Sequence, residues 1–330
     1  MGAIRILHVS DFHFCVEPRR ENLLMLLRRP KSRTIGHFLS ANSNIRIWRP
    51  ESYDPDLADA LAMFCAENID EIDLVLVTGD LATTGSARDL GVAKSYLEAP
   101  VVSGYIAASG NASIRQDDLP IFVMPGNHDR YRSDNADPGS KNFDLSFAKL
   151  QQNSYQFTDS IVLEAGEGGL LGVISCDHCL DIAGDADAPV ALCKYGQGRV
   201  YDARLSQLER ETETMMRKHA GISILWVSHF PLFDSVPFGL KLRYKENLLA
   251  LAEKMGIRVI LSGHVHKFHD EPVGRLRNIA ADASTSIDRT PENEIHILEF
   301  DLDSNPANPK IERYRFSARD GAFRPLMALP

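Results

Sequence analysis

Polar residues that could bind metal ions follow several apolar runs of this 330-residue chain. The clearest case is Gly126-Asn127-His128-Asp129, which comes directly after the apolar run Ile121–Met124. This order places an amide oxygen, an imidazole and a carboxylate at the end of a predicted strand. Because open α/β sheets bind ligands at the carboxyl ends of their strands, we expect these side chains to lie at a site.

Four other apolar runs end in similar polar residues. Asp11 and His13 follow the first run, and residues two apart in an extended chain point to the same side, so these two can reach one ion together. The same spacing brings two imidazoles to one side after the last run, in Gly263-His264-Val265-His266. The predicted ligands that end these four runs are Asp11 and His13, Asp80, His229, and His264 and His266.

With Asn127 these residues form a set of two carboxylates, one amide and four imidazoles. This set has no thiolate and therefore suits Mn, Fe or Zn ions, of which we favour Mn²⁺. Seven ligands are too many for one ion and suit two, and Asp80 is our candidate for a carboxylate that bridges them. Two such ions lower the pKa of a bridging water and so supply hydroxide at neutral pH for attack on a phosphoryl group.

The elements that position these residues alternate along the chain, which predicts α/β architecture. Six nearly continuous apolar runs predict strands buried on both faces, at 4–10, 74–78, 121–124, 171–175, 222–227 and 259–262. Amphipathic stretches predict helices at 54–67, 87–98, 203–219 and 245–255. Near the carboxyl end, 294–302 and 310–316 alternate polar and apolar residues, which predicts a half-exposed antiparallel pair in a second sheet that closes the domain.

Composition narrows the class of protein. The chain is 44% hydrophobic and 25% charged, and its net charge of −9 argues against a general nucleic-acid binder. Five cysteines do not predict a disulfide framework in a chain of this length. The first residues run directly into a strand without the features of a signal peptide, and no apolar run could span a bilayer, so we expect a cytoplasmic protein.

The order Asp-x-His, Gly-Asp, Gly-Asn-His-Asp, His and Gly-His-x-His resembles the calcineurin-like metallophosphoesterase superfamily from Asp11 to His266. The resemblance implies two mixed β-sheets packed as a sandwich and flanked by helices, in four layers. It implies one ion held by Asp11, His13, Asp80 and His266, and a second held by Asp80, Asn127, His229 and His264. It also implies that His128 contacts the phosphate or protonates the leaving group, with Asp129 orienting its imidazole.

Subfamily patterns favour a phosphodiesterase. Gly79-Asp80 continues as Leu81-Ala82-Thr83, without the Asp-Arg-Gly of the protein Ser/Thr phosphatases. What remains is similar to the cyclic-nucleotide phosphodiesterase type and its bacterial relatives. The alternatives are a pyrophosphatase or lipid-head-group phosphohydrolase at a membrane surface, a phosphomonoesterase, a nuclease, and a scaffold without activity. Filled ligand positions disfavour the scaffold, and the acidic chain disfavours the nuclease.

Three further features could contact the substrate, a small phosphoester. Arg130 follows Asp129 and could contact a phosphate, although a loop residue in solvent is an equal interpretation. His178 follows an apolar strand within Cys176-Asp177-His178-Cys179 and could enter the cleft, although packing is the favoured interpretation.

The third feature is a basic insertion at about 17–49, within a single predicted domain of residues 1–330 whose closing β-rich segment spans about 270–330. Its stretch Arg19–Arg49 is rich in arginine and should overhang the metal site. It predicts a lid for an anionic substrate, a peripheral membrane contact, or a packed helix with a solvated basic face. The sequence leaves the oligomeric state open.

Overall fold

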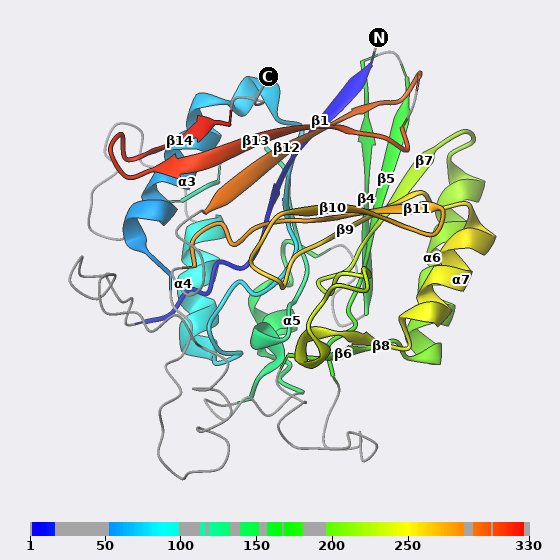
Figure 1. Ribbon diagram of the computed structural model, residues 1–330, viewed down its shortest axis with the longest axis horizontal. Helices are drawn as coiled ribbons and strands as arrows, with labels where there is room; N and C mark the ends of the chain where they lie inside the picture. Colours follow the sequence, from blue (N-terminus) through cyan, green and yellow to red (C-terminus); the bar gives the residue numbers. More distant parts are fainter. Residues whose placement is uncertain are drawn as a thin grey trace.

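The computed structural model describes residues 2–16, 53–98, 113–115, 119–132, 139–151, 157–166, 168–180, 196–286, 293–304 and 306–326. Two six-stranded mixed sheets pack face to face, with helices on both outer sides (Figure 1). This arrangement confirms the predicted sandwich of two sheets flanked by helices. Among the described residues no helix combines the length and apolarity needed to cross a membrane.

The first sheet has the order β14-β13-β12-β1-β2-β3. Its strands are β1 (Ala3–Val9), β2 (Leu74–Val77), β3 (Ile121–Val123), β12 (Glu294–Asp301), β13 (Lys310–Ser317) and β14 (Ala322–Pro325). The three strands β1, β2 and β3 are parallel, so their carboxyl ends lie at one edge.

The second sheet has the order β10-β11-β9-β7-β5-β4. Its strands are β4 (Thr158–Glu164), β5 (Leu170–Cys176), β7 (Ser223–Val227), β9 (Val259–Ser262), β10 (His269–Val273) and β11 (Leu276–Ala280). A separate parallel pair joins β6 (Gly198–Arg199) to β8 (Leu242–Arg243). Strand β4 and the β6–β8 pair were not predicted, whereas the hairpin of β10 and β11 lies at the start of the segment predicted to be β-rich, about 270–330.

The helices fall into two outer layers, with α3 and α4 on the left of Figure 1 and α6 and α7 on the right. They are α3 (Pro55–Glu67), α4 (Ala87–Glu98), α5 (Asn142–Ser146), α6 (Asp202–Lys218) and α7 (Lys245–Met255), with 3-10 turns η1 (Ile69–Glu71), η2 (His128–Arg130) and η4 (Phe238–Leu240). The four predicted helices are confirmed to within a residue at each end. Asp54 caps α3 by accepting a hydrogen bond from the Asp56 amide at 2.9 Å.

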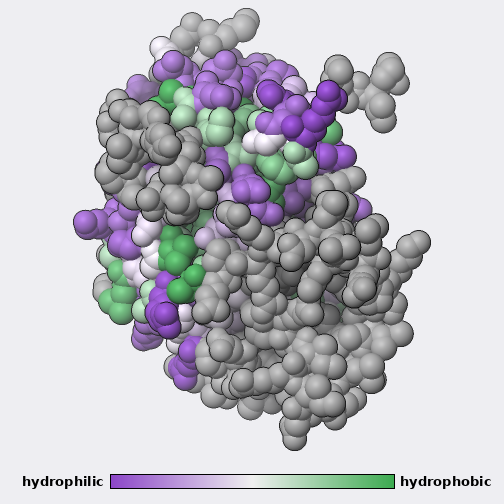
Figure 2. All heavy atoms as spheres, turned by 90° about the vertical axis from the view of Figure 1, so that its left-hand side faces the viewer, coloured by the Kyte–Doolittle hydropathy of each residue, from purple (hydrophilic) through white to green (hydrophobic). Residues whose placement is uncertain are grey.

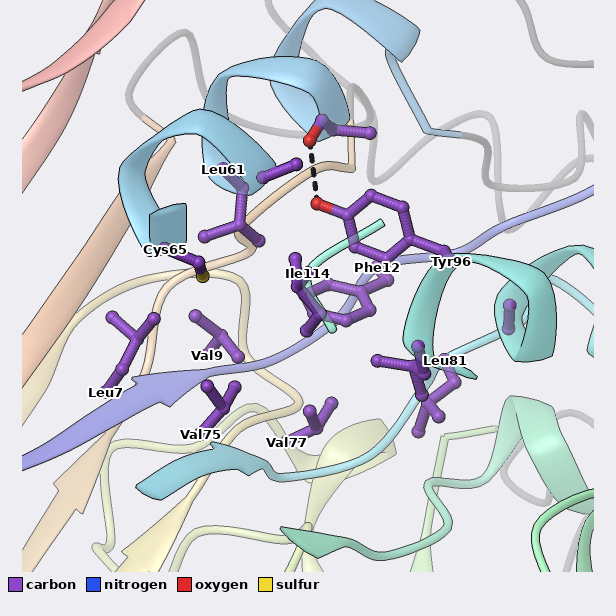
Figure 3. Close-up of a cluster of buried hydrophobic side chains, with 14 of the residues drawn as sticks. Leu7, Val9, Phe12, Leu61, Cys65, Val75, Val77, Leu81, Tyr96 and Ile114 are labelled. Carbon is purple, nitrogen blue, oxygen red and sulfur yellow. Dashed lines mark hydrogen bonds between the residues drawn. The ribbon is translucent and has the colours of Figure 1, made fainter. Parts of the chain in front are cut away.

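Three hydrophobic clusters fill the spaces between the four layers. Strand β1 is buried on both faces, which explains its continuous apolar sequence. Ile4 and Ile6 pack between the two sheets, whereas Leu7 and Val9 pack against the outer helices. Figure 3 shows this outer cluster, in which the Tyr96 hydroxyl donates to the Ala58 carbonyl at 2.6 Å. A third cluster lies between the second sheet and the helices α6 and α7.

The predicted carboxyl-terminal pair is present, but its place in the fold requires a correction. β12 and β13 are antiparallel, as predicted. Instead of forming a separate closing sheet, β12 pairs with β1 and extends the first sheet. The reason is that β12 is buried on both faces: Ile295 and Ile297 contact the helix side and Leu298 contacts the second sheet.

On the side of the molecule that faces left in Figure 1, hydrophilic and hydrophobic residues are mixed (Figure 2).

Candidate metal centre

Five strands, β1, β2, β3, β7 and β9, end at one edge of the sandwich and bring the predicted ligands together. The buried residues there are Asp11, His13, Asp80, Asn127, His128, His229, His264 and His266. Their atoms form three overlapping groups that could each hold an ion: Asp11, His13 and His266; His13, Asp80 and His128; and Asp80, His229 and His264. The residues predicted as ligands from the strand ends therefore lie together in the structure.

The first group joins the two sheets. Nε2 of His266, from the second sheet, lies 3.2 Å from Oδ1 of Asp11, from the first. Nε2 of His13 lies 3.2 Å from Nε2 of His266. Two imidazole nitrogens and a carboxylate oxygen this close to one another could together hold a transition-metal ion.

The group of Asp80, His229 and His264 lies on the other side of Asp80. Nε2 of His229 is 3.3 Å from Oδ2 of Asp80 and 3.2 Å from Oδ1 of Asn127. The same Oδ2 of Asp80 is 3.9 Å from Nε2 of His13. One carboxylate oxygen of Asp80 therefore faces imidazoles of both groups.

The hydrogen bonds of these side chains fit metal binding. Nδ1 of His229 lies 2.7 Å from the Thr78 carbonyl, which only accepts, so Nδ1 carries a proton and Nε2 is the ring nitrogen that faces Asp80. Nδ2 of Asn127 donates to the Tyr131 hydroxyl at 2.6 Å, which turns the amide oxygen toward His229. Nε2 of His264 is buried and has no hydrogen-bond partner among the described residues. Such an imidazole nitrogen is an acceptor for an ion.

The charges of the site follow from the same contacts. Burial raises the pKa of Asp80, but the imidazoles of His229 and His128 outweigh it and hold that pKa well below its ordinary value. Burial lowers the pKa of His229, but Asp80 outweighs it and raises that pKa to about 9. Burial, and then the neighbouring His229, lower the pKa of His264 to about 3, which keeps this imidazole neutral. The site thus offers ionised carboxylates and a neutral imidazole, the forms in which these groups bind metals.

The backbone around the ligands is strained. Asp11, His13, Asp80, His264 and His266 have positive φ angles, between 51° and 74°. Non-glycine residues rarely adopt this conformation, and it costs free energy that the surrounding structure must supply. A glycine is required at Gly126, since a Cβ there would lie 2.1 Å from Oδ1 of Asp80. Gly126 therefore lets the third strand end come close to Asp80.

His128 and Asp129 take different places from each other. Nδ1 of His128 lies 2.8 Å from the Thr83 carbonyl, and the His128 amide donates to Oδ1 of Asp80 at 2.8 Å. The orienting contact predicted from Asp129 is thus supplied by Thr83. The Asp129 carboxylate accepts hydrogen bonds from the amides of Leu81, Ala82 and Gly126 at 2.9–3.1 Å, and so joins the loops after β2 and β3.

Arg130, for which a phosphate contact was one prediction, binds two carboxylates in the interior. Its guanidinium is buried, binds both oxygens of Asp144 at 2.8 and 2.9 Å, and donates to Asp177 at 3.0 Å. Charge pairing of this kind in the interior fixes the loop after His128. The coulombic attraction of Asp177 and the bonds to Asp144 outweigh burial and raise the pKa of Arg130.

His178 is buried, and neither ring nitrogen has a hydrogen-bond partner among the described residues. Burial, followed by the nearby Arg204, lowers its pKa to about 3, so the ring is neutral. It is not part of the three candidate metal groups found among the described residues. The flanking Cys176 and Cys179 are free thiols packed in the core between the second sheet and its helices, which agrees with a packing role.

Two residues that hold the site, Thr78 and Thr83, were not recognised from the sequence. The carbonyls of Thr78 and Thr83 orient His229 and His128, and a backbone acceptor has no signature in a sequence. Ser284 and Thr285 brace the first ligand loop, because Ser284 accepts from the Ser10 amide at 3.1 Å and Thr285 donates to the Phe12 carbonyl at 2.8 Å. The run of small hydroxyl residues at 284–286 was a signal for this role.

The predicted basic insertion Arg19–Arg49 lies outside the described residues.

Comparison with known proteins places the whole arrangement in a family. A zebrafish (Danio rerio) dimetal phosphatase has a similar structure, with 12% sequence identity, a TM-score of 0.55 and coverage of 96% of each chain. The Plasmodium protein GAP50, described as the anchor in the inner membrane complex, is similar over 99% of this chain and 89% of its own, with 11% identity and a TM-score of 0.52. No protein with a curated description matches the sequence. The profile of the calcineurin-like phosphoesterases matches residues 4–268, and the chain therefore belongs to that family.

Proposed function

We propose that this protein hydrolyses a phosphodiester with two metal ions, one held by Asp11, His13, Asp80 and His266 and the other by Asp80, Asn127, His229 and His264. The observation that carries the proposal is that Oδ2 of Asp80 faces His13 on one side and His229 on the other. A carboxylate in this place can be shared by two ions. The family match supports a phosphoester hydrolase, and the dimetal phosphatase of similar fold supports the count of two.

The donor set favours Mn²⁺, with Fe or Zn as alternatives, because carboxylate, amide and imidazole ligands occur without thiolate. When bound, the two ions supply hydroxide at neutral pH and neutralise charge on the phosphoryl oxygens. The Thr78 carbonyl orients His229, and the Tyr131 hydroxyl orients Asn127. The site also needs no side-chain nucleophile of the Ser or Cys type.

His128 is the proton donor in this proposal. Its Nδ1 is held by the Thr83 carbonyl, and Nε2 is the nitrogen that would give a proton to the leaving oxygen. The ring packs edge to face on His13, with centroids 4.7 Å apart, and so lies beside the first group of ligands. This position supports contact with a phosphate bound at the ions.

The predicted cytoplasmic location stays a prediction.

The test is hydrolysis of bis(p-nitrophenyl) phosphate and of p-nitrophenyl phosphate by chelator-stripped protein, before and after Mn²⁺ is restored. We expect cleavage of the diester only with Mn²⁺, and a bound stoichiometry of two ions per chain by elemental analysis. Preference for the monoester would replace the proposal with a phosphatase. Two bound ions without activity on either ester would favour the alternatives predicted from the basic insertion, a pyrophosphatase or lipid-head-group phosphohydrolase.

A further inference from the structure

Tyr131 is a buried side chain that contacts two residues with different proposed roles. It follows the 3-10 turn η2 and is only 3% exposed. Its hydroxyl accepts a hydrogen bond from Nδ2 of Asn127 at 2.6 Å. Its ring packs against the imidazole of His128, with ring centres 4.8 Å apart and planes inclined by 51°. One side chain therefore touches a candidate metal ligand and the candidate proton donor.

The contact with Asn127 involves the end of the amide that cannot bind a cation. An amide side chain has an oxygen with lone pairs and an NH₂ group that only donates. While Nδ2 donates to the Tyr131 hydroxyl, Oδ1 is the atom on the side of His229 and lies 3.2 Å from its Nε2. A turn of the amide by half a revolution would instead point N–H groups toward His229. The hydrogen bond thus holds Asn127 in the orientation that a metal ligand needs.

The contact with His128 limits how its imidazole can turn. Nδ1 of His128 lies 2.8 Å from the Thr83 carbonyl, which holds one ring atom. A single hydrogen bond leaves a ring able to pivot about that atom, and close packing against the ring removes this freedom. The rings of His13 and Tyr131 supply such packing, with centres 4.7 and 4.8 Å from that of His128. The direction of Nε2, the nitrogen of the proposed proton donor, therefore depends on the Tyr131 ring.

The backbone that carries Tyr131 is itself held. Its amide donates to the His128 carbonyl at 3.1 Å, and its own carbonyl lies so close to Gly85 that a Cβ there would be 2.3 Å away. The preceding residue, Arg130, is fixed by two hydrogen bonds to the Asp144 carboxylate. A side chain on a fixed backbone can set the orientation of its neighbours.

We propose that Tyr131 is a positioning residue that couples metal binding to proton donation: its hydroxyl sets Asn127 as a ligand of the second ion, and its ring sets His128 as the donor. The two parts use different atoms of one side chain, so substitutions can separate them. The part that concerns Asn127 requires only the metal centre. The part that concerns His128 rests on the proposed phosphodiesterase function.

Tyr131→Phe tests the first part, because it removes the hydroxyl and keeps the ring. Mn²⁺ is titrated into chelator-stripped protein by calorimetry, and we expect two binding events in the wild-type protein. In Tyr131→Phe one of the two should weaken by about tenfold, the size of one lost hydrogen bond to a buried amide, while the other stays the same. The Mn²⁺ concentration that gives half-maximal diester hydrolysis should rise by a similar factor.

Two variants without an aromatic ring test the contact with His128. Tyr131→Leu and Tyr131→Met are made in parallel, because they fill the buried space differently and circular dichroism shows which of them folds. At saturating Mn²⁺, kcat for bis(p-nitrophenyl) phosphate should be at least about tenfold below that of Tyr131→Phe, with a similar KM. An equal kcat, or an effect on KM alone, would overturn the part that concerns the ring.

Tyr96→Phe is the matched control. Tyr96 is another buried tyrosine, in the cluster between the first sheet and its helices, and its hydroxyl donates to the Ala58 carbonyl at 2.6 Å. Loss of this hydroxyl should lower the free energy of unfolding without a change in either Mn²⁺ affinity.

Unchanged Mn²⁺ affinities in Tyr131→Phe would overturn the inference, as would an equal change in Tyr96→Phe. The same samples report on the proposed function separately. Selective loss of one Mn²⁺ affinity in Tyr131→Phe, with no diester hydrolysis by the wild-type protein, would retain the role of the hydroxyl and reject the phosphodiesterase. Diester hydrolysis with unchanged affinities would do the reverse.

Discussion

The two sheets contribute different chemistry to the candidate metal centre. The first sheet supplies both carboxylates and the amide, from Asp11, Asp80 and Asn127, together with His13, whereas the second supplies only imidazoles, from His229, His264 and His266. The contacts of Asp11 with His266 and of Asp80 with His229 cross from one sheet to the other. Neither sheet holds a complete ligand set, so the centre depends on how the sheets pack.

The carboxylates of the first sheet should matter most. We expect Asp80→Asn to reduce both bound Mn²⁺ and diester hydrolysis by at least about a hundredfold, because a neutral amide attracts cations less and serves two ions poorly. Elemental analysis and kcat/KM measure the two effects. Asp234→Asn is the control, because Asp234 is exposed and pairs only with Lys245 among the contacts described. Full activity in Asp80→Asn would contradict the shared role of this carboxylate.

His128 belongs to the first sheet's loops but not to the proposed ligands. His128→Ala should lower kcat by about 10²–10⁴-fold through loss of a proton donor, while bound Mn²⁺ stays near two ions per chain. Because His128 also groups with His13 and Asp80 as a candidate ligand, loss of metal in this variant would reassign it to the metal shell. Elemental analysis beside the kinetics decides between these outcomes.

The dependence on sheet packing can be tested with two matched core variants. Leu298→Ala opens a cavity between the sheets, and Leu61→Ala opens one between the first sheet and α3. Each should lower the free energy of unfolding by about 2–5 kcal/mol, measured by urea denaturation. Only Leu298→Ala should also weaken Mn²⁺ binding in calorimetry of the folded protein. Equal metal affinity in the two variants would mean that the sheets hold their ligands independently.

The smallest effect concerns His178, a buried residue that follows strand β5 of the second sheet. Its pKa is lowered from 6.5 to about 3 by burial, so below pH 6.5 the unfolded chain takes up a proton that the folded protein does not. Stability is therefore lost as the pH falls from 6.5 toward 3, by up to about 1.4 kcal/mol per pH unit.

His178→Leu removes this titrating group. The free energy of unfolding, measured by urea denaturation between pH 7 and 4, should fall less steeply in the variant than in the wild-type protein. If His178 instead binds substrate, His178→Leu will raise KM for the diester while the pH slope stays the same.

The candidate ligands could be predicted because each one follows an apolar run. Such a run is the sequence pattern of a strand that is buried on both faces. The sequence could not predict the acceptors Thr78 and Thr83, since these act through backbone carbonyls. It also could not predict the ion pair of Arg130 with Asp177, which lies 47 residues away and is brought close only by the fold. The place of β12 beside β1 depends in the same way on a pairing between the two ends of the chain.

The contact between Asp11 and His264 has a consequence for synthesis of the protein in the cell. The His264 amide donates to Oδ2 of Asp11 at 2.9 Å across a separation of 253 residues. A ribosome must therefore add 253 residues after Asp11 before this contact can form, and the second sheet's histidines emerge long after the carboxylates. An incomplete nascent chain has no finished pocket with which to capture an ion. The complete candidate site could therefore hold metal only after the histidines of the second sheet have been synthesised.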